Sequence, residues 1–169
     1  VTGSRIGRIG AEAPSPVTVI SGDDLVETGA MNIGEVLSRL PALATTFTLA
    51  NSGRFIGTAG ISTLNLRNMG TDRTLVLVNG KRRHRAALVL IGGSGSQGPD
   101  LATIPGAAVE SVEVVRDGAT ALYGSDAIAG VINFMLKDDS EGGSITMTTG
   151  EYYAGDGQDM TISGNLGFG

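Results

Sequence analysis

Cysteine and tryptophan are absent from the 169-residue chain, histidine occurs once, and aromatic residues make up only 4% of it. Without cysteine, the protein can have neither a disulfide framework nor a thiolate metal site. His84 is the only histidine, so the chain has little from which to build a Ser-His-Asp triad or a metal site of the usual kind. We therefore expect a protein that is not an enzyme, with no catalytic residue, no bound metal and no cofactor.

Positive charge and long apolar runs are also scarce. Lysine and arginine number 12 against 17 acidic residues, and the resulting net charge of −5 argues against a nucleic-acid partner. No apolar run approaches the roughly 20 residues that a membrane-spanning helix requires. The chain begins at Val1 without an initiator methionine or a signal peptide, so we expect that an upstream segment has been removed.

Glycine, by contrast, is abundant at 27 of 169 residues, which favours tight turns and closely approaching backbone. Residues 93–98 read GSGSQG and match the G-x-G-x-x-G fingerprint of dinucleotide-binding enzymes. That fingerprint requires a helix directly after the glycines, and Pro105-Gly106 would end such a helix within about two turns. We interpret residues 93–98 as a flexible loop and not as a nucleotide site.

The remaining patterns predict an α+β domain with a small mixed sheet and short helices. Ser21 is placed to cap a first helix that ends before Gly29, and Asn32 with Glu35 resembles a capping box for a second helix that stops at Pro41. Residues 74–78 are continuously apolar, as in a strand buried on both faces, and Asn79-Gly80 is a strong turn signal. The strands expected are 16–20, 63–68, 74–78, 81–84, 111–116 and 130–137.

The end of the chain has a different period. From residue 160 to 168, Met160, Ile162, Leu166 and Phe168 alternate with small polar residues, and residues 144–150 show a weaker form of the same pattern. A stretch of 9–11 alternating residues is typical of a transmembrane β-strand. We predict a hairpin of a membrane barrel, with an ordinary amphipathic surface hairpin as the alternative.

From residue 111 the chain reads SVEVVRDGATALYGSDAIAGVINFMLK, and earlier segments read NLRNMGTDRTLVLVNGKRR and DLATIPGAAVESVEVV. Together these segments closely resemble the plug domain of TonB-dependent outer-membrane receptors. The opening VTGSRI is similar to the end of the energy-coupling segment of such receptors. The resemblance implies a lead-in at 1–15, a plug domain at 16–137, a linker at 138–143 and the first barrel hairpin at 144–169.

The resemblance also implies roles for individual residues. Arg67 and Arg116 occupy positions where similar plugs place arginines that pair with barrel glutamates, and Val1, Thr2 and Gly3 fall where TonB engages the chain. The basic run 81–85 suits an anionic or polar ligand, although it could equally face an acidic barrel wall. The ligand-facing positions implied are Arg54, Phe55, Thr71, Asp72, Arg73, Arg82, Arg83, His84 and Arg85.

The resemblance further implies a cell outer membrane location in a Gram-negative bacterium, with the plug facing the barrel lumen and the periplasm. The partners implied are TonB with the inner-membrane proton-motive complex, the rest of a 22-stranded barrel on the same or another chain, outer-membrane lipid and a small solute. That solute would be an iron chelate, a vitamin or an oligosaccharide. A soluble plug-like binding or signalling module of the periplasm is the alternative.

Overall fold

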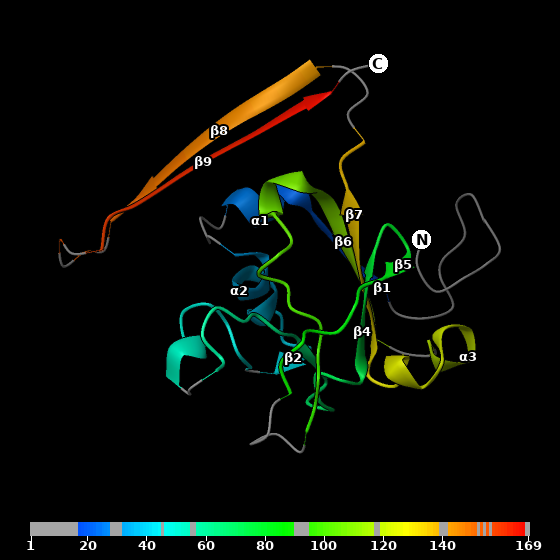
Figure 1. The fold of residues 1–169 in the computed structure, drawn as a ribbon. Helices are drawn as coiled ribbons and strands as arrows, with labels where there is room; N and C mark the ends of the chain where they lie inside the picture. Colours follow the sequence, from blue (N-terminus) through cyan, green and yellow to red (C-terminus); the bar gives the residue numbers. More distant parts are fainter. Residues whose placement is uncertain are drawn as a thin grey trace.

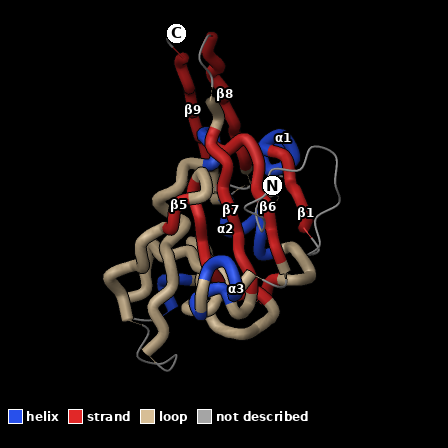
Figure 2. The backbone as a smooth tube through the Cα atoms, turned by 90° about the vertical axis from the view of Figure 1, so that its right-hand side faces the viewer, coloured by secondary structure: helices blue, strands red, loops and turns tan. Residues whose placement is uncertain are grey.

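The computed structural model describes residues 17–27, 32–44, 46–54, 57–89, 95–116, 119–138, 142–151, 153, 155 and 157–167. The predicted TonB-coupling residues Val1, Thr2 and Gly3 lie outside these described residues, as do Phe55, Gly118 and residues 93–94 at the start of the glycine-rich loop. Within the described part, a five-stranded sheet carries short helices on its two faces, and a long β-hairpin extends from the domain (Figures 1 and 2).

The central sheet is mixed, as the sequence predicts. Its strands are β1 (Val17–Ser21), β6 (Val109–Val115), β7 (Gly130–Leu136), β4 (Thr74–Val78) and β5 (Lys81–Arg82), in the order β1-β6-β7-β4-β5. Strands β4 and β7 pair in parallel, and every other neighbouring pair is antiparallel. This order leaves the short strand β5 at one edge of the sheet, where the basic run 81–85 begins.

Both faces of the sheet are buried. The larger core contains Val112, Val114, Ile132 and Phe134 and packs against helices α1 (Gly22–Glu27) and α2 (Ile33–Ser38). On the opposite face, a smaller core is covered by α3 (Thr120–Tyr123) and the 3-10 helix η4 (Ser125–Ala127). The buried residues of that smaller core are Leu75, Leu77, Val115, Ala119, Ala127 and Val131. Strand β4 contributes to both cores, which confirms the interpretation of its uninterrupted apolar run.

The predicted helix caps are present. The Oγ atom of Ser21 accepts a hydrogen bond from the amide of Asp24 at 3.1 Å, and Oδ1 of Asn32 accepts one from the amide of Gly34 at 2.7 Å. Each cap satisfies one of the amides that a helix leaves unpaired in its first turn. The second helix ends at Ser38, three residues before Pro41, and Leu40 packs on the larger core from the turn that follows.

Two predicted strands are much shorter than expected. The segment 63–68 forms only β3 (Asn65–Leu66), which pairs with β2 (Leu43–Ala44), because Arg67 and Asn68 adopt positive φ angles of 57° and 58° that end the strand. The returning strand 81–84 is limited to β5, whose two residues pair with Val78 and Leu77.

Glu113 departs from the predicted alternation. Its position between Val112 and Val114 predicts a solvent-exposed side chain, but Glu113 is buried, next to Asn133 of the neighbouring strand. Nδ2 of Asn133 lies 3.5 Å from a carboxylate oxygen of Glu113. Strand β6 has a strand on either side, and the pairing places Asn133 of β7 directly beside Glu113.

The predicted hairpin is confirmed. Strands β8 (Gly142–Gly150) and β9 (Asp159–Gly167) pair antiparallel over their full length and project from the domain as the orange and red strands of Figure 1. The register places Met147 opposite Ile162, so the large apolar side chains gather on one face. That face is open: Ile145, Ile162 and Leu166 are 85%, 64% and 69% exposed. Among the described residues, no helix has the length and apolar character needed to cross a membrane.

Candidate functional site

The loop 70–73 precedes β4, and the Asn79-Gly80 turn follows β4. The loop and the turn therefore lie at opposite ends of the sheet. Asp72 and Arg73 are at least partly exposed there, whereas Thr71 is buried beneath the loop. A Cβ atom built on Gly98 would lie 2.8 Å from Cβ of Thr71, so the backbone at the end of the glycine-rich loop packs directly on it. The structure thus corrects the expectation that Thr71 faces a ligand.

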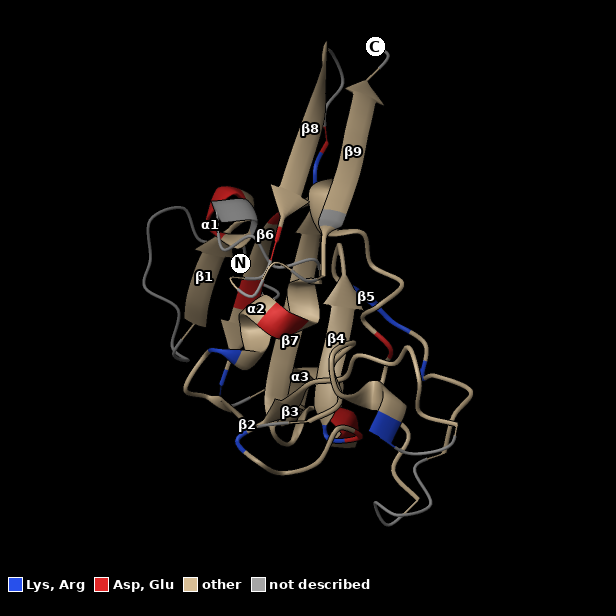
Figure 3. Ribbon diagram, turned by 90° about the vertical axis from the view of Figure 1, so that its left-hand side faces the viewer, with Lys and Arg blue, Asp and Glu red and all other residues tan. Residues whose placement is uncertain are grey.

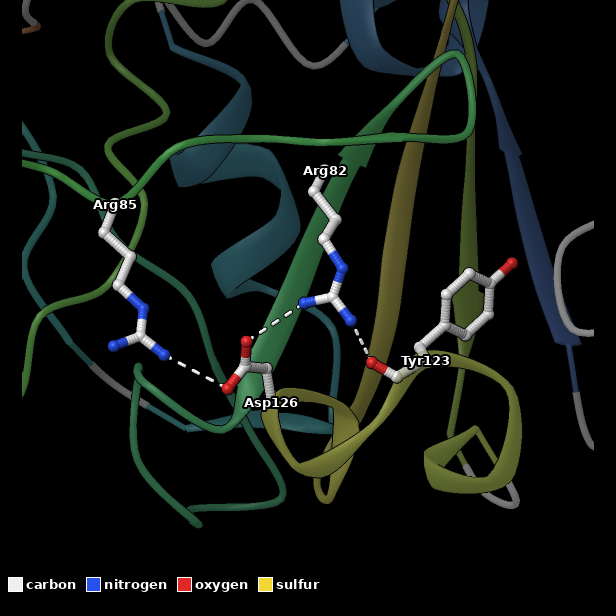
Figure 4. A network of polar contacts seen from close by, with 4 residues as sticks. All are labelled: Arg82, Arg85, Tyr123 and Asp126. Atoms are coloured by element: carbon white, nitrogen blue, oxygen red, sulfur yellow. Dashed lines mark hydrogen bonds and ion pairs between the residues drawn. The ribbon is translucent and has the colours of Figure 1, made fainter.

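Two of the predicted basic residues converge on one carboxylate (Figure 4). Nη1 of Arg82 lies 3.0 Å from one carboxylate oxygen of Asp126, and Nη2 of Arg85 lies 3.1 Å from the other. Arg82 also donates a hydrogen bond to the carbonyl of Tyr123. We call Arg82, Arg85 and Asp126 the Asp126 clamp. It joins the segment after β5 to the helices on the smaller core and neutralises part of the charge predicted to attract a ligand.

The other members of the basic run have different surroundings. Nη2 of Arg83 donates to Oγ1 of Thr103 at 2.6 Å, and its Nε is buried without a hydrogen-bond partner. Lys81 and His84 are exposed. Arg54, at the end of the 3-10 helix η1 (Ser52–Arg54), is likewise exposed. The side chains of residues 81–85 therefore lie in three different environments and do not form one uniform basic patch.

The two arginines predicted to hold the domain in a barrel lie side by side. Arg67 follows β3 and Arg116 follows β6, yet Nη1 of Arg67 donates to the carbonyl of Arg116 at 3.0 Å. Both arginines are exposed. The positive φ angle of Arg67 turns the chain away from its strand at this point. The structure thus brings the Arg67 guanidinium to the backbone of Arg116, 49 residues away in the sequence.

The segment 119–130 packs tightly on the sheet. The ring of Tyr123 packs against the smaller core and points away from the Asp126 clamp in Figure 4. Its hydroxyl makes no hydrogen bond with the described residues. Gly124 has a φ of 82°, and Gly130 lies so close to β6 that a Cβ atom would stand 2.2 Å from the carbonyl oxygen of Val115.

Sequence reasoning missed Asp126 as a site residue. It sits in the motif YGSDAIAG, and its partners are 41 and 44 residues away, so no local pattern reports the contact. The described residues also contain no group of three or more histidine, cysteine or acidic side chains that could hold a metal ion. The site offers charged recognition groups on loops around a rigid sheet.

The chain is a small α+β domain that leads directly into an exposed β-hairpin with one apolar and one polar face. This combination defines the class of protein: a plug domain followed by the start of its barrel. The family follows from comparison of the sequence with known families. Residues 10–131 match the family model described as "TonB-dependent Receptor Plug Domain", and the chain belongs to this family.

Solved receptors share the fold. The siderophore receptor PirA from Acinetobacter baumannii is 29% identical over 88% of this chain, with a TM-score of 0.66. The siderophore receptor PirA from Pseudomonas aeruginosa is 27% identical over 82% of the chain, with a TM-score of 0.53. The ferric enterobactin receptor PfeA from Pseudomonas aeruginosa is 25% identical over 90% of the chain, with a TM-score of 0.67. The match covers 21%, 22% and 22% of these receptors, so the chain spans about a fifth of their length.

Proposed function

We propose that this chain is the plug and first barrel hairpin of a TonB-dependent active transporter of the Gram-negative outer membrane. The transporter binds a scarce solute at the cell surface and imports it into the periplasm, using proton-motive force relayed by TonB. The observation that carries the proposal is the two-faced hairpin that directly follows a domain of the plug family.

The hairpin has the chemistry of a barrel strand pair. One face carries Ile145, Met147, Met160, Ile162 and Leu166, and the other carries small polar side chains between its glycines. The polar residues of that second face are Ser144, Thr146, Thr148, Thr161, Ser163 and Asn165. In a lipid-embedded barrel the apolar face contacts acyl chains and the polar face lines the lumen. A soluble module would leave the apolar face in water with nothing to cover it.

The proposed division of the chain is the one that the resemblance to TonB-dependent receptors implies. Residues 1–15 form the end of the TonB-coupling segment, 16–137 the plug, 138–143 a linker and 144–169 the first hairpin. Within the lead-in, Val1, Thr2 and Gly3 would join a sheet edge of TonB by strand addition, which uses backbone hydrogen bonds. The other partners are outer-membrane lipid, the inner-membrane proton-motive complex and the rest of a 22-stranded barrel, because an open hairpin edge is not tolerated in lipid. The transport cycle requires no cofactor.

The ligand-facing positions that we propose first at the plug apices are Arg54, Arg73 and His84, which are exposed, and Asp72, which is partly exposed. Arg82 and Arg85 are already paired with Asp126 and are therefore weaker candidates for electrostatic capture. The solved receptors named above include siderophore receptors, so a ferric siderophore is the first solute to test. A vitamin or an oligosaccharide is the next candidate, because the plug fold by itself does not select a solute.

The test uses the full-length receptor in a Gram-negative host that lacks its own receptors for the solutes offered. Uptake of a labelled ferric catecholate, of cobalamin and of a maltooligosaccharide is measured with and without TonB, and with a protonophore. We expect accumulation of one solute that is lost when TonB is deleted or the proton gradient is collapsed. Recovery of the protein in the soluble periplasmic fraction, without detergent, would instead support the soluble plug-like module.

A further inference from the structure

Arg83 is the one arginine of the run 81–85 that is half-buried without a counter-ion among the described residues. Its backbone amide donates to the carbonyl of Val76 at 2.9 Å, which extends the pairing of β5 with β4 by one residue. Its side chain has one neutral acceptor, Oγ1 of Thr103, while Nε is buried and unpaired. Partial removal of a cation from water without a carboxylate partner is unfavourable.

The nearby acidic residues form no ion pair with Arg83. Asp126 binds Arg82 and Arg85. Side chains alternate across a strand, so Arg82 reaches the helices on the smaller core while Arg83 reaches the loop around Thr103 on the other side. In that loop, Oδ1 of Asp100 already accepts hydrogen bonds from the amides of Ser62 and Ala102, both at 3.0 Å.

The position of Arg83 at the edge of the sheet indicates where its counter-ion comes from. Strand β5 is the last strand of the sheet, and the basic residues after it run along the outer side of the domain in Figure 3. The chain covers only 21–22% of the length of the siderophore receptors named above. On the proposed function, the surface that would enclose this edge belongs to the rest of the barrel.

We propose that Arg83 pairs with a carboxylate on the inner wall of the barrel and forms a plug–barrel contact separate from Arg67 and Arg116. This inference rests on the proposed function, because it requires an enclosing barrel. The buried inner edge of the guanidinium, with Thr103 as its acceptor, fixes the orientation of the group. The part of the side chain that remains exposed is then available to a carboxylate, whose charge compensates a cation that the plug leaves uncompensated.

Zero-length cross-linking in the full-length receptor tests this contact. In an Arg83→Lys variant, a water-soluble carbodiimide joins the lysine amine to a touching carboxylate as an amide, and the water lost is taken up by the reagent as a urea. We expect mass spectrometry to find residue 83 linked to an acidic residue beyond residue 169. The matched variant Arg85→Lys should link to Asp126 within the plug, because that pair lies at 3.1 Å.

Three results would overturn the inference. The first is a link from Lys at position 83 only to an acid within residues 1–169. The second is no link at position 83 while position 85 links to Asp126. The third, which needs no cross-linker, is unchanged hydrogen exchange of the amides of 83–89 in Arg83→Gln receptor, where we expect severalfold faster exchange. These failures are distinct from failure of the proposed function, because a receptor lacking this contact would still show TonB-dependent uptake.

Discussion

Gly130 is the first residue of the central strand β7. Its backbone conformation disfavours a side chain, and neighbouring atoms leave no room for one. Its φ angle is 137°, and a Cβ atom would lie 2.2 Å from the carbonyl oxygen of Val115 and 2.6 Å from Cδ2 of Leu66. We predict that Gly130→Ala lowers the free energy of unfolding by roughly 1–3 kcal/mol, because backbone strain and steric overlap add. Urea unfolding of the chain in mild detergent, followed by circular dichroism, measures the change.

Gly53→Ala is the matched control for Gly130→Ala. Gly53 lies in η1, and a Cβ atom added to it would have no neighbouring atom within 4 Å, so the same methyl group meets open space. We expect Gly53→Ala to leave the urea midpoint nearly unchanged. Equal midpoints for the two variants would show that the close approach of β7 to β6 is not as tight as the structure has it.

Arg67 and Arg116 extend the argument to the contact between plug and barrel. The Arg67 guanidinium donates to the backbone carbonyl of Arg116 at 3.0 Å and both side chains are exposed, so on the proposed function both arginines are placed to meet one region of the barrel wall. We predict that replacing both with alanine in the full-length receptor loosens the plug, so that it unfolds or is released at lower urea concentration. Shielded bidentate pairs with carboxylates are strong enough for their loss to be measurable.

The control for the arginine pair is Arg39→Ala, which removes an exposed arginine whose side chain makes no hydrogen bond or ion pair with the described residues. It should leave plug retention as in the unmodified receptor. If the double variant also retains its plug at every urea concentration, Arg67 and Arg116 do not hold the domain in place.

At the scale of elements, the Asn79-Gly80 turn connects three strands. Both residues have positive φ angles, 47° and 74°, as a tight hairpin turn between twisted strands requires. The side chain of Asn79 adds a second function, because its Oδ1 accepts the amide of Leu136 at 2.8 Å while its own amide donates to Phe134 at 2.8 Å. The turn therefore continues the β4–β7 pairing beyond the end of β4.

We predict that Asn79→Ala destabilises the sheet by about 1–2 kcal/mol, because it removes the acceptor for Leu136 and a residue type that tolerates positive φ. The measurement is hydrogen exchange of the Leu136 amide, which should become faster. Asn79→Asp keeps an acceptor oxygen and should retain most of the protection. Unchanged protection in Asn79→Ala would mean that the side-chain bond contributes nothing to the ladder.

Comparison of the expected and observed elements shows which features local sequence predicts and which features it does not. The caps at Ser21 and Asn32, the buried strand β4 and the alternation of β9 were predictable because each depends on residues a few positions apart. The strand at 63–68 was overestimated because the sequence does not report the positive φ angles that end it.

Long-range contacts account for the remaining errors. Asp126 was missed because its contacts with Arg82 and Arg85 join segments more than 40 residues apart, and the burial of Thr71 depends on the backbone near Gly98. The alternation of Val112 and Val114 likewise does not report the burial of Glu113, which lies opposite Asn133 of the neighbouring strand. Local patterns thus predict the elements, and the tertiary arrangement decides which charged residues can act.

At the scale of the whole molecule, the open question is what surrounds the hairpin. Its apolar face has no covering layer among the described residues, and its polar face consists of side chains too small to form a core. The chain spans about a fifth of the length of these solved relatives, and the proposed function assigns the surroundings of the hairpin to the rest of a barrel and to lipid. The two faces of β8 should then respond oppositely to charge.

Met147 and Thr148 are adjacent residues of β8 on opposite faces, with Met147 paired to Ile162 and Thr148 to Thr161. We predict that Met147→Arg in the full-length receptor strongly reduces the folded fraction in the outer membrane, because arginine on the lipid face near mid-membrane costs about 2–4 kcal/mol. The variant Thr148→Arg places the charge on the lumen face, so its folded fraction should be far higher. Heat-modifiable migration on gels measures the folded fraction of each. Equal assembly of both variants would show that neither face contacts lipid, and the hairpin would then belong to a soluble module.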